Sequence, residues 1–161
     1  MDRFDEAGRA QQLLQEAYRA QMDKSYDSAV ELYQKSIDLC PTAEAHTYLG
    51  WTYSFMNRLD DAIEECRRAI LVDPDFGNPY NDIGSYLMKQ GKLEEAILWL
   101  EKAKLASRYE PRHYPYLNLG RIYLATGRFE EARRELAQAR FVFENLVRPA
   151  TRSGDPTGPA N

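Results

Sequence analysis

The segment 48–70 reads YLGWTYSFMNRLDDAIEECRRAI, and its pattern returns as DIGSYLMKQGKLEEAILWLEKAK at 82–104 and as NLGRIYLATGRFEEARRELAQAR at 118–140. Small residues recur at fixed places in these copies. The glycines are 34 and 36 residues apart, and two sets of alanines keep the same intervals. The three sets are Gly50, Gly84 and Gly120; Ala62, Ala96 and Ala132; and Ala69, Ala103 and Ala139. Such a period predicts a repeat architecture.

Each copy predicts two antiparallel helices joined by a short polar turn. Apolar residues at helical spacing define the first helix, and Asn57-Arg58, Gly91-Lys92 or Gly127-Arg128 interrupts it. Acidic pairs such as Asp60-Asp61 begin the second helix, where the positive end of the helix dipole favours them. Glycine inside a helix is less favourable than alanine by roughly 1 kcal/mol. Its recurrence therefore predicts a close contact between the two helices.

A fainter copy precedes these three. In SYDSAVELYQKSIDLCP, at 25–41, Ala29 stands 33 residues before Ala62. We expect its first helix at about Ala10–Met22, with Ala17 in place of the glycine. The chain is thus expected to be an all-α solenoid of about four hairpins within a domain at 1–148. The predicted repeats are 10–42, 43–76, 77–112 and 113–147, and a disordered tail rich in proline and glycine is expected at 149–161.

The pattern resembles the tetratricopeptide repeat (TPR) family, which has an aromatic residue, Leu-Gly and tyrosine in helix A, and alanine, an aromatic residue, alanine and proline in and after helix B. The resemblance covers roughly residues 10–146 and departs at His46, at Cys66 and in the missing final proline of the fourth unit. It implies a right-handed superhelix of antiparallel helix pairs whose A helices line a concave groove. The implied function is a protein-binding scaffold or adaptor.

Composition and charge exclude several other classes. The chain has 161 residues and a formal charge of −4, which gives no reason to expect nucleic-acid binding. We find neither a secretory leader nor an apolar run of membrane-spanning length, so we expect a cytoplasmic location without membrane insertion. Cys40 and Cys66 belong to no metal-binding pattern and are expected to be reduced packing residues. No metal or other cofactor is predicted.

The sequence offers no set of residues typical of catalysis, and we predict that the chain is not an enzyme. It has two histidines: His46 in a core position, where a local hydrogen bond would satisfy it, and His113 in a loop. The acid pairs, Glu64-Glu65 among them, are attributed to helix starts and to solvation rather than to acid–base chemistry.

The resemblance places a groove on the inward face of the A helices. A peptide or helical segment of another protein is the expected occupant, and the candidate contacts are Tyr18, Trp51, Phe55, Asn81, Ser85, Lys89 and Arg121. The alternative is that Trp51 and Phe55 are covered by the N-terminal segment or by a neighbouring helix. Some family members bind the acidic tail of chaperones through lysine and asparagine, but Leu14 and Tyr18 stand at those positions here.

The C-terminal part suggests a second class of function. Phe141, Phe143 and Leu146 have no following helix to cover them, so they either pack back on the last hairpin or mediate self-association, as in a homodimer. The insertion SRYEPRHYPY at 107–116 is either a contact loop or a longer connection. An RNA-binding helical repeat of the pentatricopeptide type is a third class, which the acidic charge and the recurring small residues count against.

Overall fold

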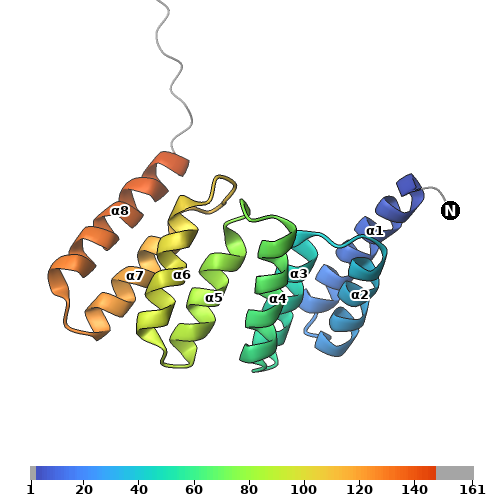
Figure 1. The fold of residues 1–161 in the computed structure, drawn as a ribbon, viewed down its shortest axis with the longest axis horizontal. Coiled ribbons are helices and arrows are strands. Elements are labelled where there is room, and N and C mark those ends of the chain that lie inside the picture. The colour runs from blue at the N-terminus through green and yellow to red at the C-terminus, as the bar shows by residue number, and fades with distance from the viewer. Residues whose placement is uncertain (1–2, 148–161) are drawn as a thin grey trace, which may run out of the picture.

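The computed structural model describes residues 3–147, and its regular elements in this range are helices (Figure 1). They follow one another as four hairpins. In chain order they are α1 (Arg3–Met22), α2 (Tyr26–Leu39), α3 (Ala43–Phe55), α4 (Leu59–Val72), α5 (Asn78–Lys89), α6 (Leu93–Leu105), α7 (Tyr114–Ala125) and α8 (Phe129–Val147). The expected all-α array of about four hairpins is confirmed. The predicted tail at 149–161 lies outside the described residues.

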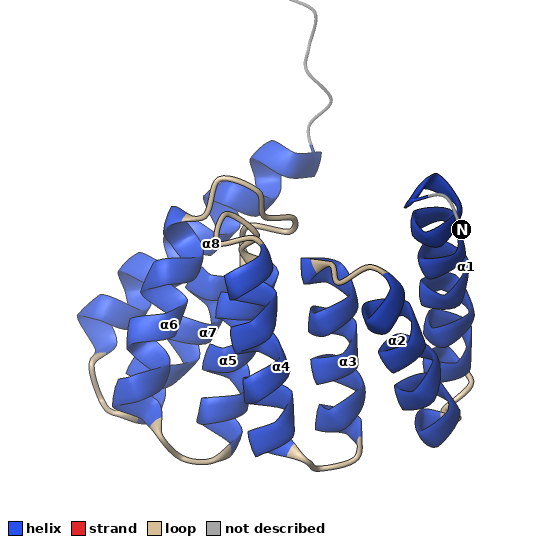
Figure 2. Cartoon of the chain, turned by 45° about the vertical axis from the view of Figure 1, so that its right-hand side comes forward, coloured by secondary structure: helices blue, strands red, loops and turns tan. Residues whose placement is uncertain are grey.

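The helices form two layers, one of odd-numbered and one of even-numbered helices (Figures 1 and 2). Each odd-numbered helix packs on the even-numbered helix that follows it, and each even-numbered helix packs on the next hairpin. The odd-numbered helices also contact one another, from α1 to α3, α5 and α7. Within residues 3–147, the backbones of the even-numbered helices do not approach one another so closely, and side chains such as Lys104 and Glu135 span the distance between them. The odd-numbered layer is therefore the tighter, inner side of a curved array.

The turn inside every hairpin has the same backbone conformation. One residue in each turn has a left-handed φ, between 58° and 76°, and these residues are Lys24, Asn57, Gly91 and Gly127. The next amide then donates to the carbonyl five residues earlier, for example from Arg58 to Tyr53 at 2.9 Å. This pairing satisfies a carbonyl at the end of the first helix and reverses the chain. Glycine adopts the conformation without strain in the third and fourth hairpins.

The recurring glycines lie where the two helices of a hairpin touch, as the sequence predicts. A Cβ on Gly50 would lie 2.9 Å from the carbonyl oxygen of Ala62, and one on Gly84 would lie 2.6 Å from the side chain of Leu100. Gly120 meets Leu136 in the same way. The alanines of the even-numbered helices at this contact are buried as well. Small side chains on both helices thus set the hairpin spacing.

Helix α1 begins earlier than the sequence suggests. We expected a start near Ala10, whereas the helix runs from Arg3. One side of α1 is polar, and Gln12, Glu16 and Arg19 on this side are exposed. Their equivalents in α3, at the same offsets from the glycine position, are Ala45, Leu49 and Thr52, and these are buried. No recurring small residue marks the first turns of α1, so the periodicity gave no signal there.

The 106–113 connection between α6 and α7 packs back on the 73–77 connection between α4 and α5. Gly77 N–H donates to the Arg108 carbonyl at 2.9 Å, and Arg108 N–H donates to the Asp75 carbonyl at 3.0 Å. The side chain of Arg108 pairs with Asp73 at 2.6 Å and with Glu44 at 2.7 Å. Tyr109 is buried against Gly77. The insertion is therefore a longer connection that also joins neighbouring repeats.

His46 and Glu65 form a buried hydrogen-bonded pair between α3 and α4. His46 Nδ1 lies 2.7 Å from Glu65 Oε2, and Arg68 donates to the other carboxylate oxygen at 2.8 Å. The core position of His46 is as predicted. The assignment of Glu65 to helix-start solvation is wrong, because this carboxylate is buried and bonded on both oxygens. Asp60-Asp61, Glu94-Glu95 and Glu130-Glu131 do occupy first turns.

Candidate functional site

The inner layer carries an aromatic cluster over its first half. The rings of Trp51 and Phe55, one turn apart on α3, have centroids 5.3 Å apart. Tyr26 stacks on Phe55 at 5.5 Å, and Tyr18 of α1 meets Tyr48 of α3 at 5.7 Å. Phe55 keeps 47% of its surface exposed and Tyr18 keeps 41%. Neighbouring helices hold these rings in place and leave Phe55 and Tyr18 accessible, whereas Trp51, Tyr26 and Tyr48 are partly covered.

A hollow of about 320 Å³ lies between α1 and α3 beside this cluster. Its lining mixes apolar and amide side chains, namely Gln11, Leu14, Gln15, Tyr18, Arg19 and Tyr48. Such a surface suits a polypeptide, because it offers apolar contact area together with hydrogen-bonding groups for a backbone.

The second half of the inner layer is polar. Asn118 of α7 donates from Nδ2 to Asn81 Oδ1 of α5 at 3.1 Å, and Arg121 donates to Asn118 Oδ1 at 3.2 Å. Asn81 and Asn118 are each only 8% exposed, whereas Arg121 is exposed. The two amides therefore form a buried support that orients Arg121 at the surface.

Asp82 follows Asn81 on α5 and carries a carboxyl group that acts on Cys66 of α4 and on Tyr109. Burial raises its pKa to about 7, while a hydrogen bond from Asn81 and the charge of Lys89 act in the opposite direction. Its carboxylate in turn helps to raise the pKa of Tyr86, Tyr109 and Cys66, although desolvation is the larger cause for each. The protonation of this carboxyl group on α5 thus changes near neutral pH.

The predicted groove residues take up different positions. Trp51, Phe55 and Tyr18 lie in the aromatic half, with Trp51 partly covered, and Ser85 is half-buried on α5. Lys89 is exposed, with its Nζ 5.8 Å from the centre of the Tyr86 ring. Asn81 is buried and its side-chain oxygen is already occupied, which the sequence did not indicate.

Sequence reasoning missed Tyr26, Tyr48, Asp82 and Asn118. Tyr26 belongs to an even-numbered helix, so a search confined to the A helices passes over it. Asn118 stands three residues before Arg121, and this spacing on a helix is a usable signal for a side-chain hydrogen bond.

The C-terminal apolar residues are divided between packing and exposure. Phe143 meets the ring of His113 edge-on at 5.1 Å, so α8 does pack back on the α6–α7 connection. Phe141 nevertheless remains 63% exposed, and Leu146 44%. Both alternatives for this helix therefore have support, and self-association stays a prediction.

These features define a two-layer helical-repeat protein with an open inner wall. Two family models described as tetratricopeptide repeat match residues 43–76 and 75–145, which together make up more than half of the chain. The chain belongs to the tetratricopeptide repeat family, as its resemblance implied.

Two curated relatives bear the name small glutamine-rich tetratricopeptide repeat-containing protein 2. The one from Mycosarcoma maydis is 31% identical over 94 residues, which are 58% of this chain and 27% of the relative. The one from Saccharomyces cerevisiae is 28% identical over 97 residues, 60% of this chain and 28% of the relative. The chain spans about a quarter of the length of these relatives.

Solved structures share the fold at low sequence identity. The pilF structure of Pseudomonas aeruginosa superposes with a TM-score of 0.78 at 24% identity, over 88% of this chain and 63% of that one. The second TPR of Spaghetti (RPAP3), bound to the HSP90 peptide SRMEEVD, gives a TM-score of 0.59 at 22% identity, over 63% of this chain and 94% of that one. These likenesses establish the solenoid fold.

Within residues 3–147, no helix has both the length and the apolar character needed to cross a membrane.

Proposed function

We propose that this chain is a non-catalytic protein-interaction scaffold that holds a polypeptide segment of a partner along its inner wall. The observation that carries this proposal is the run of accessible aromatic rings on α1 and α3, next to a hollow of about 320 Å³. Large exposed aromatic side chains are typical anchors of protein interfaces. We expect the interaction to take place in the cytoplasm.

The two halves of the wall suggest how a segment would lie. Its apolar side chains would contact Phe55 and Tyr18, which are accessible, while Arg121 would receive a carboxylate from the other part of the segment. The Asn81–Asn118 pair holds Arg121 ready for that contact, so less conformational entropy is lost on binding. Lys89 offers a second cation on the same wall.

The Spaghetti domain in the compared structure holds an HSP90 peptide. For the present chain we propose a different mode of recognition. Leu14 and Tyr18 stand where a lysine and asparagine clamp would need polar groups, and Tyr18 is engaged with Tyr48. A peptide ending in consecutive carboxylates is therefore not the expected partner.

Affinity capture from the native cell tests the groove. We expect the wild-type chain to retain a defined partner and the variant Phe55→Glu/Arg121→Glu to lose it. The matched control is Leu98→Glu/Lys35→Glu, which makes the same kinds of change on exposed residues of the even-numbered helices. Equal capture by wild type and the groove variant, with circular dichroism showing both folded, would refute the assignment.

Self-association through α8 is the second candidate, favoured by the exposure of Phe141 and Leu146. A dimer should appear in light scattering at high concentration and dissociate in Phe141→Glu. A monomer at every concentration, unaffected by this change, would remove the candidate. The variant Phe129→Glu is a suitable control, because Phe129 is an exposed phenylalanine at the opposite end of the same helix.

A further inference from the structure

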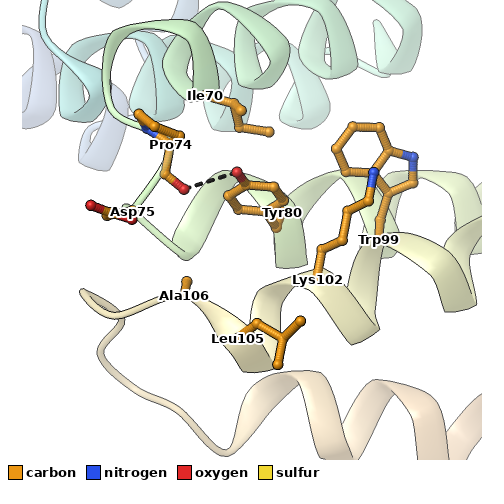
Figure 3. A pocket seen from close by; sticks show the side chains of 8 residues that line it. All are labelled: Ile70, Pro74, Asp75, Tyr80, Trp99, Lys102, Leu105 and Ala106. Atoms are coloured by element: carbon orange, nitrogen blue, oxygen red, sulfur yellow. Dashed lines mark hydrogen bonds between the residues drawn. The ribbon is translucent and has the colours of Figure 1, made fainter.

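A second pocket, of about 380 Å³, shares no lining residue with the hollow between α1 and α3 (Figure 3). It opens where the end of α4, the connection to α5, the start of α5 and the end of α6 meet. Its lining is mainly apolar and consists of Ile70, Pro74, Asp75, Tyr80, Trp99, Lys102, Leu105 and Ala106. The hydroxyl of Tyr80 donates to the Pro74 carbonyl at 2.9 Å, which fixes one wall (Figure 3).

The repeat provides two internal comparisons for this pocket. Each junction between repeats is built from equivalent residues, defined by their offset from the glycines. At the first junction these are Ile37, His46 and Glu65, at the middle one Ile70, Tyr80 and Trp99, and at the last Lys104, Tyr116 and Glu135. In two of the three junctions, the fifteenth residue after the glycine is a glutamate, whereas in the middle one it is Trp99.

Both glutamates are paired with cations. Glu65 lies 2.8 Å from Arg68 Nη1, and Glu135 lies 2.9 Å from Lys104 Nζ. The Lys104–Glu135 pair joins α6 to α8 across the last junction, whereas Glu65 and Arg68 both belong to α4.

The middle junction has two cations but no glutamate at the equivalent position. Lys102 is equivalent to Arg68, and its Nζ lies 4.6 Å from the centre of the Trp99 ring. Arg67 lies over the same ring at 5.2 Å. Among the described residues 3–147, no salt bridge joins either cation to a carboxylate. Two positive charges therefore lie on the Trp99 side of an apolar pocket, at the point where the other junctions hold a glutamate, whereas Asp75 lies on the other side beside Pro74 (Figure 3).

We propose that this pocket binds a partner's polypeptide segment in which an apolar side chain stands next to a carboxylate. The apolar side chain would lie against the rings of Tyr80 and Trp99, whose centroids are 6.1 Å apart, and the carboxylate would pair with Lys102 and Arg67, as Glu65 and Glu135 do with their own cations. Apolar burial supplies contact area, and the two cations select an acidic neighbour. This site is separate from the inner wall and goes beyond the proposed function.

A minimal peptide tests the chemistry directly. The probe is acetyl-Gly-Leu-Glu-Glu-Gly-amide, and its neutral counterpart has glutamine at both acidic positions. Binding is followed through the indole N–H signals of the two tryptophans in ¹H–¹⁵N spectra, assigned with Trp99→Phe. We expect the acidic peptide to shift the Trp99 signal saturably and the neutral peptide to bind roughly tenfold more weakly. The Trp51 signal reports on the groove, so failure of one site is distinguishable from failure of the other.

Charge reversal provides the second measurement. Arg67→Glu/Lys102→Glu should abolish the shift, whereas Lys35→Glu/Lys92→Glu, which changes net charge equally at exposed lysines elsewhere, should retain it. Equal binding of the acidic and neutral peptides, unchanged binding by the charge-reversed variant, or an unmoved Trp99 signal at saturating probe concentration would each overturn the proposal.

Discussion

The second and third repeats have the same hairpin and the same small residues, yet their aromatic and charged side chains lie on opposite sides. In the second repeat Trp51 and Phe55 lie on the inner wall, and the Glu65–Arg68 pair lies on the outer side. In the third repeat Lys89 is on the inner wall and Trp99 is on the outer side, under Lys102. Positions that set helix spacing are thus constrained, while the others are free to acquire different binding chemistry.

The largest expected effect concerns the constrained position itself. Gly50→Ala should lower the free energy of unfolding by about 2 kcal/mol, because the new methyl group meets the Ala62 backbone oxygen, which cannot rotate away. Gly84→Ala should cost less, since the atoms in its way belong to the rotatable side chain of Leu100. Urea unfolding followed by circular dichroism measures both.

Gly8 is the control for helix propensity. It lies in α1, and a Cβ added to it would have no neighbouring atom within 4 Å, so Gly8→Ala should raise stability by about 0.5–1 kcal/mol. The close-contact explanation is wrong if Gly50→Ala proves as stable as Gly8→Ala.

A smaller effect is expected at the outer side of the second repeat. Glu65→Gln should lower the unfolding free energy by about 1–2 kcal/mol, because the buried contacts to His46 and Arg68 lose their charge. Glu64→Gln is the matched control. Its carboxylate is exposed and lies 3.7 Å from Arg68, so the change should stay within about 0.5 kcal/mol. Equal unfolding curves for the two variants would contradict a structural role for the buried pair.

The smallest effect distinguishes the first helices of the two repeats by the pH dependence of stability. Asp82 in the third repeat has a pKa of about 7, whereas Tyr48, its equivalent in the second repeat, carries no carboxyl group. Between its ordinary pKa of 3.8 and about 7, the folded chain holds a proton that the unfolded chain has lost. Stability due to this group therefore falls as the pH rises through that range.

Replacing the carboxyl group should remove this dependence. Asp82→Asn should gain thermal stability relative to wild type on going from pH 5 to pH 8, measured as the difference in Tm. Asp27→Asn, at an exposed position on α2, should follow the wild type at both pH values. A constant Tm difference for Asp82→Asn would show that Asp82 does not titrate in this range.

The sequence predicted the features that repeat and missed those that occur once. Gly50, Gly84 and Gly120 located the hairpins and their closest contacts because the same steric requirement recurs at a fixed interval. The buried role of Glu65 was missed because one partner, His46, lies on α3, while the other, Arg68, lies one turn further along α4. The Trp99 pocket was missed as well. Aligning the repeats places Trp99 where the other two have Glu65 and Glu135, and this difference could have indicated the pocket.

The candidate groove was predicted less completely, since it depends on contacts between repeats. Phe55 and Arg121 are exposed where helical spacing places them. The hydrogen bond between the side-chain amides of Asn81 and Asn118 joins residues 37 positions apart, and no local sequence pattern predicts it.

The packed 106–113 connection bears on how the array deforms. A solenoid changes its curvature through small rotations between neighbouring units. Here Arg108 contacts Asp73 and Glu44, and its backbone bonds to Asp75 and Gly77, so rotation of the second, third and fourth repeats is coupled. The first two repeats are joined differently, by a buried hydrogen bond from the Thr52 hydroxyl to Gln21 at 3.0 Å and by the contact of the Tyr18 and Tyr48 rings. The connection therefore acts as a brace, and the last three repeats should change curvature together rather than one at a time.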